Sequence, residues 1–373
     1  MDNRFIFGLK QTSGHLKSEK VNIIILPLYG IGDVLMTTPA LRVLKTHCKD
    51  CRITYLNMFR STYEVLRNNP NIDSLVHFPF LEKSALETLR FSLPLRGKFD
   101  CSINFYPSNR RQYNMLAFII GAKTRIGHRY LHVDKQELNF LKNKTFIEDP
   151  RLHNVEENMR LLEFLGIKQD IIPPMEIFLS PEENSSGMEL VRRSSAGIKI
   201  GIHAGTSTFK GHAHKRWPKE NFVELINRLP QYSFYLFGDK DEEEANAFIS
   251  DSVADRERVI IIKGAPIREV AAAIKNLDLF IANDSGLMHL AAATGTPVVA
   301  LFGPTNPYFV RPWGESYRVM RMDLDCSPCF YYSPRPLRCT SRNEFRCLRD
   351  LPVSSVQNAV EDLLFETGKR EKC

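Results

Sequence analysis

Three clusters of small and polar residues have the types and spacing that phosphate chemistry requires. The densest, NDSGLMHLAAATGTP, runs from Asn283 to Pro297 and places Asp284, Ser285 and Gly286 directly before an expected helix. Backbone N–H groups at the start of a helix bind phosphate oxygens, so this cluster predicts a phosphate site. His289 lies one helical turn after Ser285 and shares its face. It is either a structural histidine or a ligand contact.

A second cluster, HAGTSTFKGHAHKRWP, combines hydroxyl side chains with positive charge between residues 203 and 218. Thr206 and Ser207 follow an expected strand, where their hydroxyl and backbone N–H groups can donate to a phosphate. Lys215 and Arg216 add two cations just before the next expected helix. The pattern favours a phosphate-binding loop.

The third cluster, PLYGIGDVLMTTP, comprises residues 27–39 and directly follows the first expected strand. Gly30 and Gly32 permit a tight turn and close approach of a ligand to the backbone. A dinucleotide fingerprint requires a third glycine where Leu35 stands, and no P-loop motif occurs in the chain. Asp33 is therefore either a helix cap or a general base for an incoming hydroxyl group.

Short apolar runs alternate with helical patterns, which is typical of parallel βαβ units. Strands are expected at residues 21–26, 52–57, 74–78, 99–106, 198–203, 232–237, 258–263, 279–282 and 297–302. Helices are expected at residues 33–47, 61–69, 111–121, 155–166, 219–229, 241–250, 267–276, 286–293 and 353–365. Each half thus predicts a doubly wound sheet, which binds ligands beyond the carboxyl ends of its strands.

The best linker is the proline-rich stretch 171–187, IIPPMEIFLSPEENSSG. We therefore expect two Rossmann-like domains, at residues 1–180 and at residues 181–350, facing each other across a cleft. The last segment, 351–373, is expected to be helical.

Composition excludes several classes of protein. The chain has 373 residues, of which 43% are hydrophobic and 25% charged, so neither wholesale disorder nor a fibrous repeat fits. No apolar run is long enough to span a bilayer, and the N-terminus lacks the apolar core of a secretion signal, so we expect a cytoplasmic protein. The net charge of +7 suits an anionic partner, but no block of like charges indicates nucleic acid.

Four of the eight cysteines, Cys326, Cys329, Cys339 and Cys347, are grouped with C-x₂-C-x₉-C-x₇-C spacing. Four thiolates can hold a structural Zn²⁺ or iron ion, and plain reduced thiols are the alternative. Cys48 and Cys51 form another C-x₂-C pair, which has no partner pair and is interpreted as incidental.

The segments GDVLMTTPAL, HAGTS…KRWP, NDSGLMHLAAATGTP and ALFGPTNP resemble, in order and spacing, the ADP-heptose:lipopolysaccharide heptosyltransferases of glycosyltransferase family 9. The resemblance covers roughly residues 21–360. It implies the GT-B architecture, with residues 1–180 as the acceptor-side domain, residues 181–350 as the nucleotide-sugar-binding domain and residues 351–373 as a helix that crosses back to the first domain. It also implies an inverting transfer of heptose from ADP-heptose to a lipopolysaccharide inner-core or lipid A-linked acceptor. It also implies that catalysis requires no metal or other cofactor.

The resemblance implies roles for individual residues. Asp33 would be the base that deprotonates the acceptor hydroxyl, and Lys215 would neutralise the diphosphate leaving group. Asp284 would hold the heptose, and Glu242, with Asp241 as its rival, would bind the ribose hydroxyls. The remaining matched positions are Thr206, Ser285, Gly286 and His289 for donor phosphate and sugar, Gly264 for adenine, and Arg60 and Arg125 for the acceptor.

Two other functions stay open from the sequence. The acceptor could be a protein hydroxyl or a different surface glycan, or the chain could be a non-catalytic protein that binds a nucleotide-sugar. Because a lipopolysaccharide acceptor is a lipid, we expect peripheral contact with the inner face of the inner membrane through basic and amphipathic surface.

Overall fold

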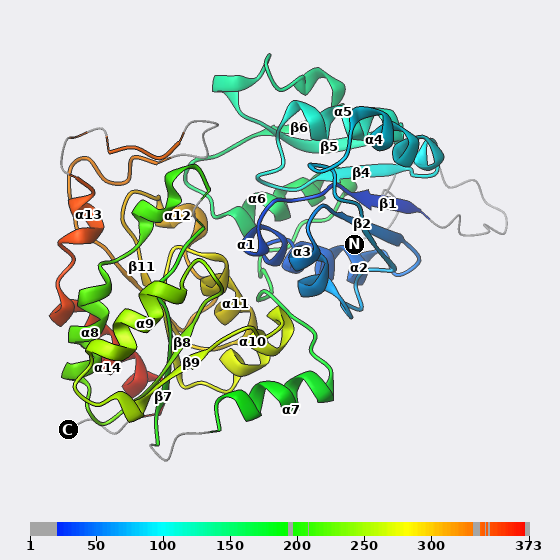
Figure 1. The fold of residues 1–373 in the computed structure, drawn as a ribbon. Helices are drawn as coiled ribbons and strands as arrows, with labels where there is room; N and C mark the ends of the chain where they lie inside the picture. The colour runs from blue at the N-terminus through cyan, green and yellow to red at the C-terminus, as the bar shows by residue number, and fades with distance from the viewer. Residues whose placement is uncertain are drawn as a thin grey trace. The chain divides into compact units, whose positions relative to one another are not determined.

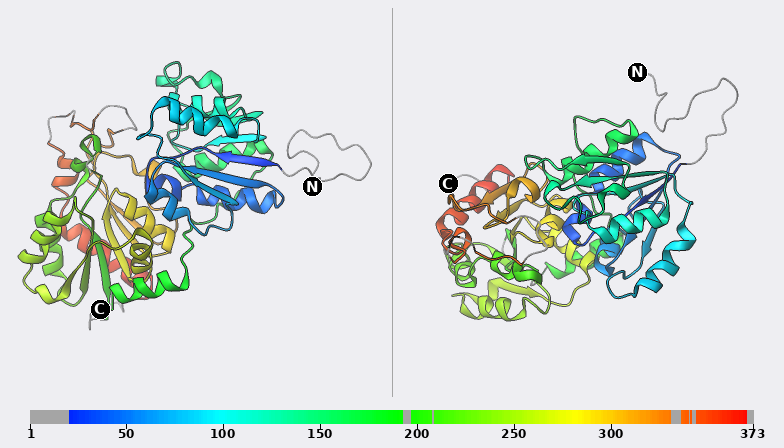
Figure 2. Two further views of the ribbon diagram at one scale, coloured as in Figure 1. Left: turned by 45° about the vertical axis from the view of Figure 1, so that its right-hand side comes forward. Right: turned by 90° about the horizontal axis from the view of Figure 1, so that it is seen from above.

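The computed structural model describes residues 21–192, 197–207, 209–330, 336–339, 341 and 344–369. The chain divides into two compact units, Met1–Phe178 and Leu179–Cys373, whose boundary lies two residues before the one predicted from the sequence. Within these described residues, each unit holds one six-stranded sheet in which all strands are parallel. Helices lie on both faces of each sheet (Figures 1 and 2).

The first sheet has the strand order β3-β2-β1-β4-β5-β6. Its strands are β1 (Asn22–Ile25), β2 (Arg52–Asn57), β3 (Ser74–His77), β4 (Cys101–Asn104), β5 (Thr124–Arg129) and β6 (Lys144–Ile147). Its helices are α1 (Ile31–Leu35), α2 (Thr38–His47), α3 (Arg60–Leu66), α4 (Ala85–Ser92), α5 (Arg111–Ile120) and α6 (Asn154–Leu161), with short 3₁₀ turns η1 (Leu93–Leu95), η2 (Leu131–Val133), η3 (Asn139–Leu141) and η4 (Leu162–Leu165).

The second sheet has the order β12-β11-β10-β7-β8-β9. Its strands are β7 (Lys199–His203), β8 (Ser233–Phe237), β9 (Val259–Ile262), β10 (Leu279–Asn283), β11 (Val298–Leu301) and β12 (Tyr317–Met320). Its helices are α7 (Pro181–Leu190), α8 (Lys219–Arg228), α9 (Glu243–Ser252), α10 (Ile267–Lys275), α11 (Gly286–Thr294), α12 (Pro307–Val310), α13 (Arg346–Arg349) and α14 (Val353–Glu366), with 3₁₀ segments η5 (Phe209–Lys215) and η6 (Arg256–Arg258).

Continuous apolar runs form the central strands because both faces of a parallel sheet are covered by helices. Ile23, Ile24 and Ile25 of β1 are all fully buried, and so is every residue of β10. The buried face of α14 packs against α8, β11 and β12 of the second unit, where Val360 and Leu364 join the core. The crossing of this helix to the first domain stays a prediction.

Three local expectations differ from the structure. The helix expected at residues 33–47 is two helices, α1 and α2, separated at Met36 and Thr37. Part of the expected linker is helical, since Ser180 accepts a hydrogen bond from the backbone of Glu183 and starts α7. Cys48 and Cys51, interpreted as incidental, are joined by a disulfide.

Candidate active site

The polar clusters of the second unit gather at one edge of its sheet. β10, β7 and β8 are neighbours and parallel, so the loops that follow them leave from the same edge. These loops carry Asp284 after β10, Thr206 after β7 and Glu242 after β8. The sequence-predicted residues of this unit are thereby brought together from segments far apart in the chain.

Lys215 and Asp284 form a nearly buried ion pair at this edge, with 2.8 Å between Nζ and Oδ2. The Phe330 ring covers the ammonium group, whose nitrogen lies 4.9 Å from the ring centroid. Burial acts to raise the pKa of the Asp284 carboxyl, but Lys215 outweighs it and holds this pKa below its usual value. A charged aspartate and a cation are therefore placed together where little water reaches them.

Two buried histidines adjoin this pair. His203 Nδ1 lies 2.9 Å from the Ser285 hydroxyl, and burial lowers the pKa of His203 to about 4. Burial also lowers the pKa of His289 to about 4, and its Nδ1 atom makes no hydrogen bond to any described residue. Leaving such an atom unsatisfied is costly in a purely structural histidine, which supports a ligand-binding role for His289.

Glu242 is nearly buried, whereas its rival Asp241 is exposed. One carboxylate oxygen accepts a hydrogen bond from Arg216 Nη2 at 2.8 Å, and the other accepts one from the backbone N–H of Asp239 at 3.2 Å. Burial raises the pKa of the Glu242 carboxyl. A Cβ atom at Gly205 would lie 2.2 Å from the Glu242 side chain, so only glycine leaves room for it there.

Arg216 also donates to the backbone carbonyl of Thr206 at 2.7 Å, which ties the loop after β7 to Glu242. The Thr206 hydroxyl donates to the carbonyl of His212 at 2.8 Å. Ser207 is exposed at the same loop. From the sequence, Arg216 was identified only as a positive charge, because its partners Thr206 and Glu242 lie 10 and 26 residues away.

Two glycines of the second unit that the sequence predicted as site residues, Gly264 and Gly286, have different backbone roles. Gly264 follows β9 with a φ of +67° and no atom within 4 Å of a built Cβ, so its need for glycine is conformational. Gly286 is the first residue of α11 and follows Ser285 at the N-cap.

In the first unit Asp33 lies in the first turn of α1, after the carboxyl end of β1. Its Oδ2 accepts a hydrogen bond from the backbone N–H of Gly30, the N-cap residue of α1, at 3.0 Å. Asp33 therefore does contribute to capping this helix. This contact fixes the direction of the carboxylate and leaves its role as a base a prediction. Gly32 is buried within the same helix.

The surroundings of Asp33 include residues that the sequence analysis did not single out. Burial raises the pKa of the Tyr113 hydroxyl to about 12, with smaller electrostatic effects from Arg110, Asp33 and Tyr29. These groups therefore lie near one another at the carboxyl edge of the first sheet. No sequence motif marks Tyr113, which reaches this place from α5.

The two candidate acceptor arginines differ in what they contact. Arg60 is largely exposed, pairs with Glu64 at 2.7 Å and lies over the Tyr63 ring. Arg125 donates to the backbone carbonyls of Leu141 at 2.6 Å and Ala122 at 2.8 Å. Arg125 thus stabilises the loops around α5, and its acceptor role stays a prediction.

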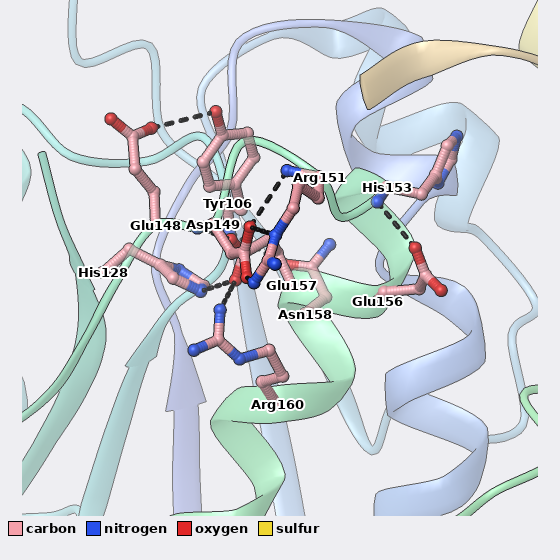
Figure 3. Close-up of polar contacts among 10 residues, drawn as sticks. All are labelled: Tyr106, His128, Glu148, Asp149, Arg151, His153, Glu156, Glu157, Asn158 and Arg160. Atoms are coloured by element: carbon pink, nitrogen blue, oxygen red, sulfur yellow. Dashed lines mark hydrogen bonds and ion pairs between the residues drawn. The ribbon is translucent and has the colours of Figure 1, made fainter. Parts of the chain in front are cut away.

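A buried polar network on α6 supports the strand ends of the first unit (Figure 3). Asn158 accepts from the backbone N–H of Tyr106 at 2.7 Å and donates to the carbonyl of Met36 at 3.1 Å. Glu157 pairs with His128 at 3.0 Å and with Arg160 at 2.8 Å. Because Met36 directly follows α1, this network helps to position the helix that carries Asp33.

The metal site predicted at Cys326, Cys329, Cys339 and Cys347 is not supported. Cys329 is exposed and Cys347 is buried, while the other two are half-buried. Among the residues that the structure describes, no group of three or more His, Cys, Asp or Glu side chains is arranged to hold a metal. The segment instead places Phe330 over Lys215, which the sequence did not indicate.

Comparison with known proteins identifies the family. Residues 90–336, about two thirds of the chain, match the model of glycosyltransferase family 9 (heptosyltransferase). The chain belongs to this family. Lipooligosaccharide heptosyltransferase 2 of Campylobacter jejuni is 29% identical over 346 residues, which cover 90% of this chain and 95% of that protein. The chain is accordingly a glycosyltransferase.

Solved structures show that the fold of this family-9 member is shared. The ADP-heptose lipopolysaccharide heptosyltransferase II of Escherichia coli aligns with a TM-score of 0.73 and 21% identity, covering 93% of this chain and 100% of that one. A family-9 glycosyltransferase of Veillonella parvula aligns with a TM-score of 0.76 and 24% identity, covering 93% and 98%. The predicted GT-B fold class, with two doubly wound parallel sheets, is confirmed.

No helix within the described residues is both long and apolar enough to cross a membrane.

Proposed function

We propose that this protein transfers heptose from ADP-heptose to a lipopolysaccharide inner-core acceptor, with inversion at the anomeric carbon and without a catalytic metal. The observation that carries the proposal is the nearly buried Lys215–Asp284 pair beside His289 and Ser285. The printed names of its relatives, a lipooligosaccharide heptosyltransferase and an ADP-heptose heptosyltransferase, supply the donor and acceptor classes.

The proposed reaction is a single displacement. The acceptor hydroxyl oxygen forms a bond to the anomeric carbon while the bond from that carbon to the diphosphate oxygen breaks, and ADP leaves with the electron pair. Asp33 takes the hydroxyl proton, a step that typically contributes ~10²–10⁴ in rate. Lys215 stabilises the negative charge that develops on the leaving diphosphate, and attack from the opposite face inverts the anomeric configuration.

Donor recognition divides among the residues already placed. Glu242 accepts from the ribose hydroxyls, Gly264 lines the adenine through its backbone, and Asp284 holds the heptose. Thr206, Ser207, Ser285, Gly286 and His289 contact the phosphates and sugar. On the acceptor side, Arg60 and Arg125 are the proposed anion contacts, and Gly32 is a further proposed substrate contact. The lipid acceptor implies peripheral contact with the cytoplasmic face of the inner membrane.

Calorimetric titration with ADP, UDP, GDP and CDP tests the donor. We expect clear preference for ADP, weakened about tenfold or more by Lys215→Ala because one cation on the diphosphate is lost. Lys219→Ala, which removes a more exposed lysine four residues later, should leave ADP binding unchanged. Preference for UDP or GDP would exclude the heptose donor, and binding of none of the four would exclude the enzyme.

Asp33→Asn tests the base. ADP affinity should be unchanged while turnover falls by ~10²–10⁴, because the amide cannot accept the proton. Exposed Asp170→Asn is the control with normal turnover. Full turnover of Asp33→Asn would show that another group removes the proton.

A further inference from the structure

Large apolar side chains are exposed together on α4, η1 and α5 of the first unit. Leu86, Leu89, Leu93, Met115 and Phe118 are each between 38% and 57% exposed. Soluble proteins rarely expose contiguous apolar groups of this size without a partner. We call these five residues, together with the basic residues Arg90, Lys98, Arg111 and Lys123, the α4–α5 surface.

The five side chains point away from the sheet. In α4 and η1, Leu86, Leu89 and Leu93 are spaced i, i+3 and i+7, which places them on one helical face. Phe91 and Leu95 on the other face pack against the core cluster that holds Leu116 and Ile120 of α5. Because α4 and α5 bury their inner faces in the same cluster, their outer faces are turned to the same side.

The helices are also joined directly, so the surface is continuous. Arg96 donates to the carbonyl of Ile119 at 3.3 Å, and the backbone N–H of Gly97 donates to Ile120 at 2.9 Å. These contacts connect the end of η1 to the end of α5. Figure 1 shows α4 and α5 next to each other.

Positive charge surrounds the apolar residues. Residues 81–125 contain eight Lys and Arg but only three Asp and Glu, so this stretch contributes much of the net charge of +7. Arg90, Lys98, Arg111 and Lys123 are exposed. A nucleic acid or acidic protein would match the charge but not the five apolar side chains, whereas an anionic bilayer matches both.

We propose that the α4–α5 surface docks this protein on anionic lipid, with the leucines, Met115 and Phe118 inserted among the acyl chains and the basic side chains at the headgroups. The inference deepens the proposed function, because a lipid-linked acceptor lies in such a membrane. Docking on the lipid surface requires neither the sugar donor nor the acceptor, so it can be tested without measuring enzyme turnover.

Co-sedimentation of the full chain with vesicles tests the docking. Vesicles of phosphatidylcholine with phosphatidylglycerol should bind the protein, and vesicles of phosphatidylcholine alone should bind it much less. Leu86→Ser combined with Leu89→Ser and Leu93→Ser should weaken binding about tenfold or more, and so should Arg90→Glu with Lys98→Glu. Only the charge-dependent part should fall with added salt.

Matched controls change the same residue types elsewhere. Ile171→Ser, Met188→Ser and Phe365→Ser together remove exposed apolar groups, and Lys168→Glu with Arg192→Glu reverses exposed charges. Both control proteins should bind vesicles normally, and all variants should retain ADP binding. If the leucine and charge variants bind anionic vesicles as well as the parent chain does, the proposal is wrong. A dimer that the leucine substitutions dissociate, without vesicle binding by the parent chain, would instead assign this surface to a second copy.

Discussion

The charged side chains of the candidate site in the second unit form ion pairs with one another in the absence of a ligand. Lys215 pairs with Asp284, and Arg216 pairs with Glu242, each at 2.8 Å. A buried charge without a partner is strongly destabilising, so these pairs stabilise the site when no ligand is bound. In the proposed reaction, the diphosphate would compete with Asp284 for Lys215, whereas Glu242 would keep its Arg216 contact while it accepts hydrogen bonds from the ribose.

Arg216→Met tests whether Arg216 orients Glu242. Without the guanidinium the carboxylate is free to turn, so preference for ADP over 2′-deoxy-ADP should fall about tenfold, as expected for loss of a hydrogen bond to a charged group. Glu242→Gln in the Arg216→Met background should then have little additional effect on this preference. Titration calorimetry with both nucleotides measures it.

Arg228→Met is the control, since it breaks an exposed pair with Glu224 on α8. It should leave the preference unchanged. Equal weakening of both nucleotides by Arg216→Met would show that Arg216 holds the loops and does not orient Glu242.

At the scale of elements, the close contact of α7 with α10 depends on one glycine. A Cβ at Gly187 would lie 2.3 Å from the Cβ of Ala272 and 2.5 Å from its backbone carbon. Alanine improves helix propensity by up to ~1 kcal/mol, but the clash involves backbone that cannot move without separating the helices. Packing therefore outweighs propensity at this position.

Gly187→Ala should lower the free energy of unfolding by about 1–3 kcal/mol, the typical cost of overpacking. Urea denaturation monitored by circular dichroism measures the change. Gly197→Ala is the matched control, because a Cβ there meets no atom within 4 Å. A stabilised Gly187→Ala protein would mean that α7 does not pack closely on α10.

At the scale of the whole molecule, buried histidines make stability depend on pH. The pKa values of His203 and His289 are lowered by burial to about 4, below the 6.5 of an unfolded histidine. Between these values the unfolded chain binds the protons that the folded chain excludes, so stability falls as pH decreases from 6.5 toward 4. Each histidine can contribute up to about 3 kcal/mol to this loss.

His289→Gln should reduce the loss of unfolding free energy between about pH 7 and pH 5, because glutamine binds no proton there. Urea denaturation at both pH values measures the difference. An unchanged pH dependence in His289→Gln would show that the pKa of His289 is the same in the folded and the unfolded chain.

Local patterns predicted the parallel α/β class and the place of each motif, because continuous apolar runs and helix-start residues act over a few neighbours. The strands β5, β6 and β12 were not predicted from the sequence. Most of their residues are polar or only partly buried, so these strands lack the continuous apolar run that marks a central strand. The Ser180–Glu183 capping box, with Pro181 at the first helical position, could have revealed α7.

The sequence by itself determined which residue types follow the strands, and therefore which side chains were candidates for chemistry. Only the tertiary structure decided which of them meet. Lys215 and Asp284 are 69 residues apart, and parallel pairing of β7 with β10 brings their loops together. Glu242 and Asp241 are adjacent in the chain, and they are distinguished by burial against Gly205, a contact that sequence spacing does not encode.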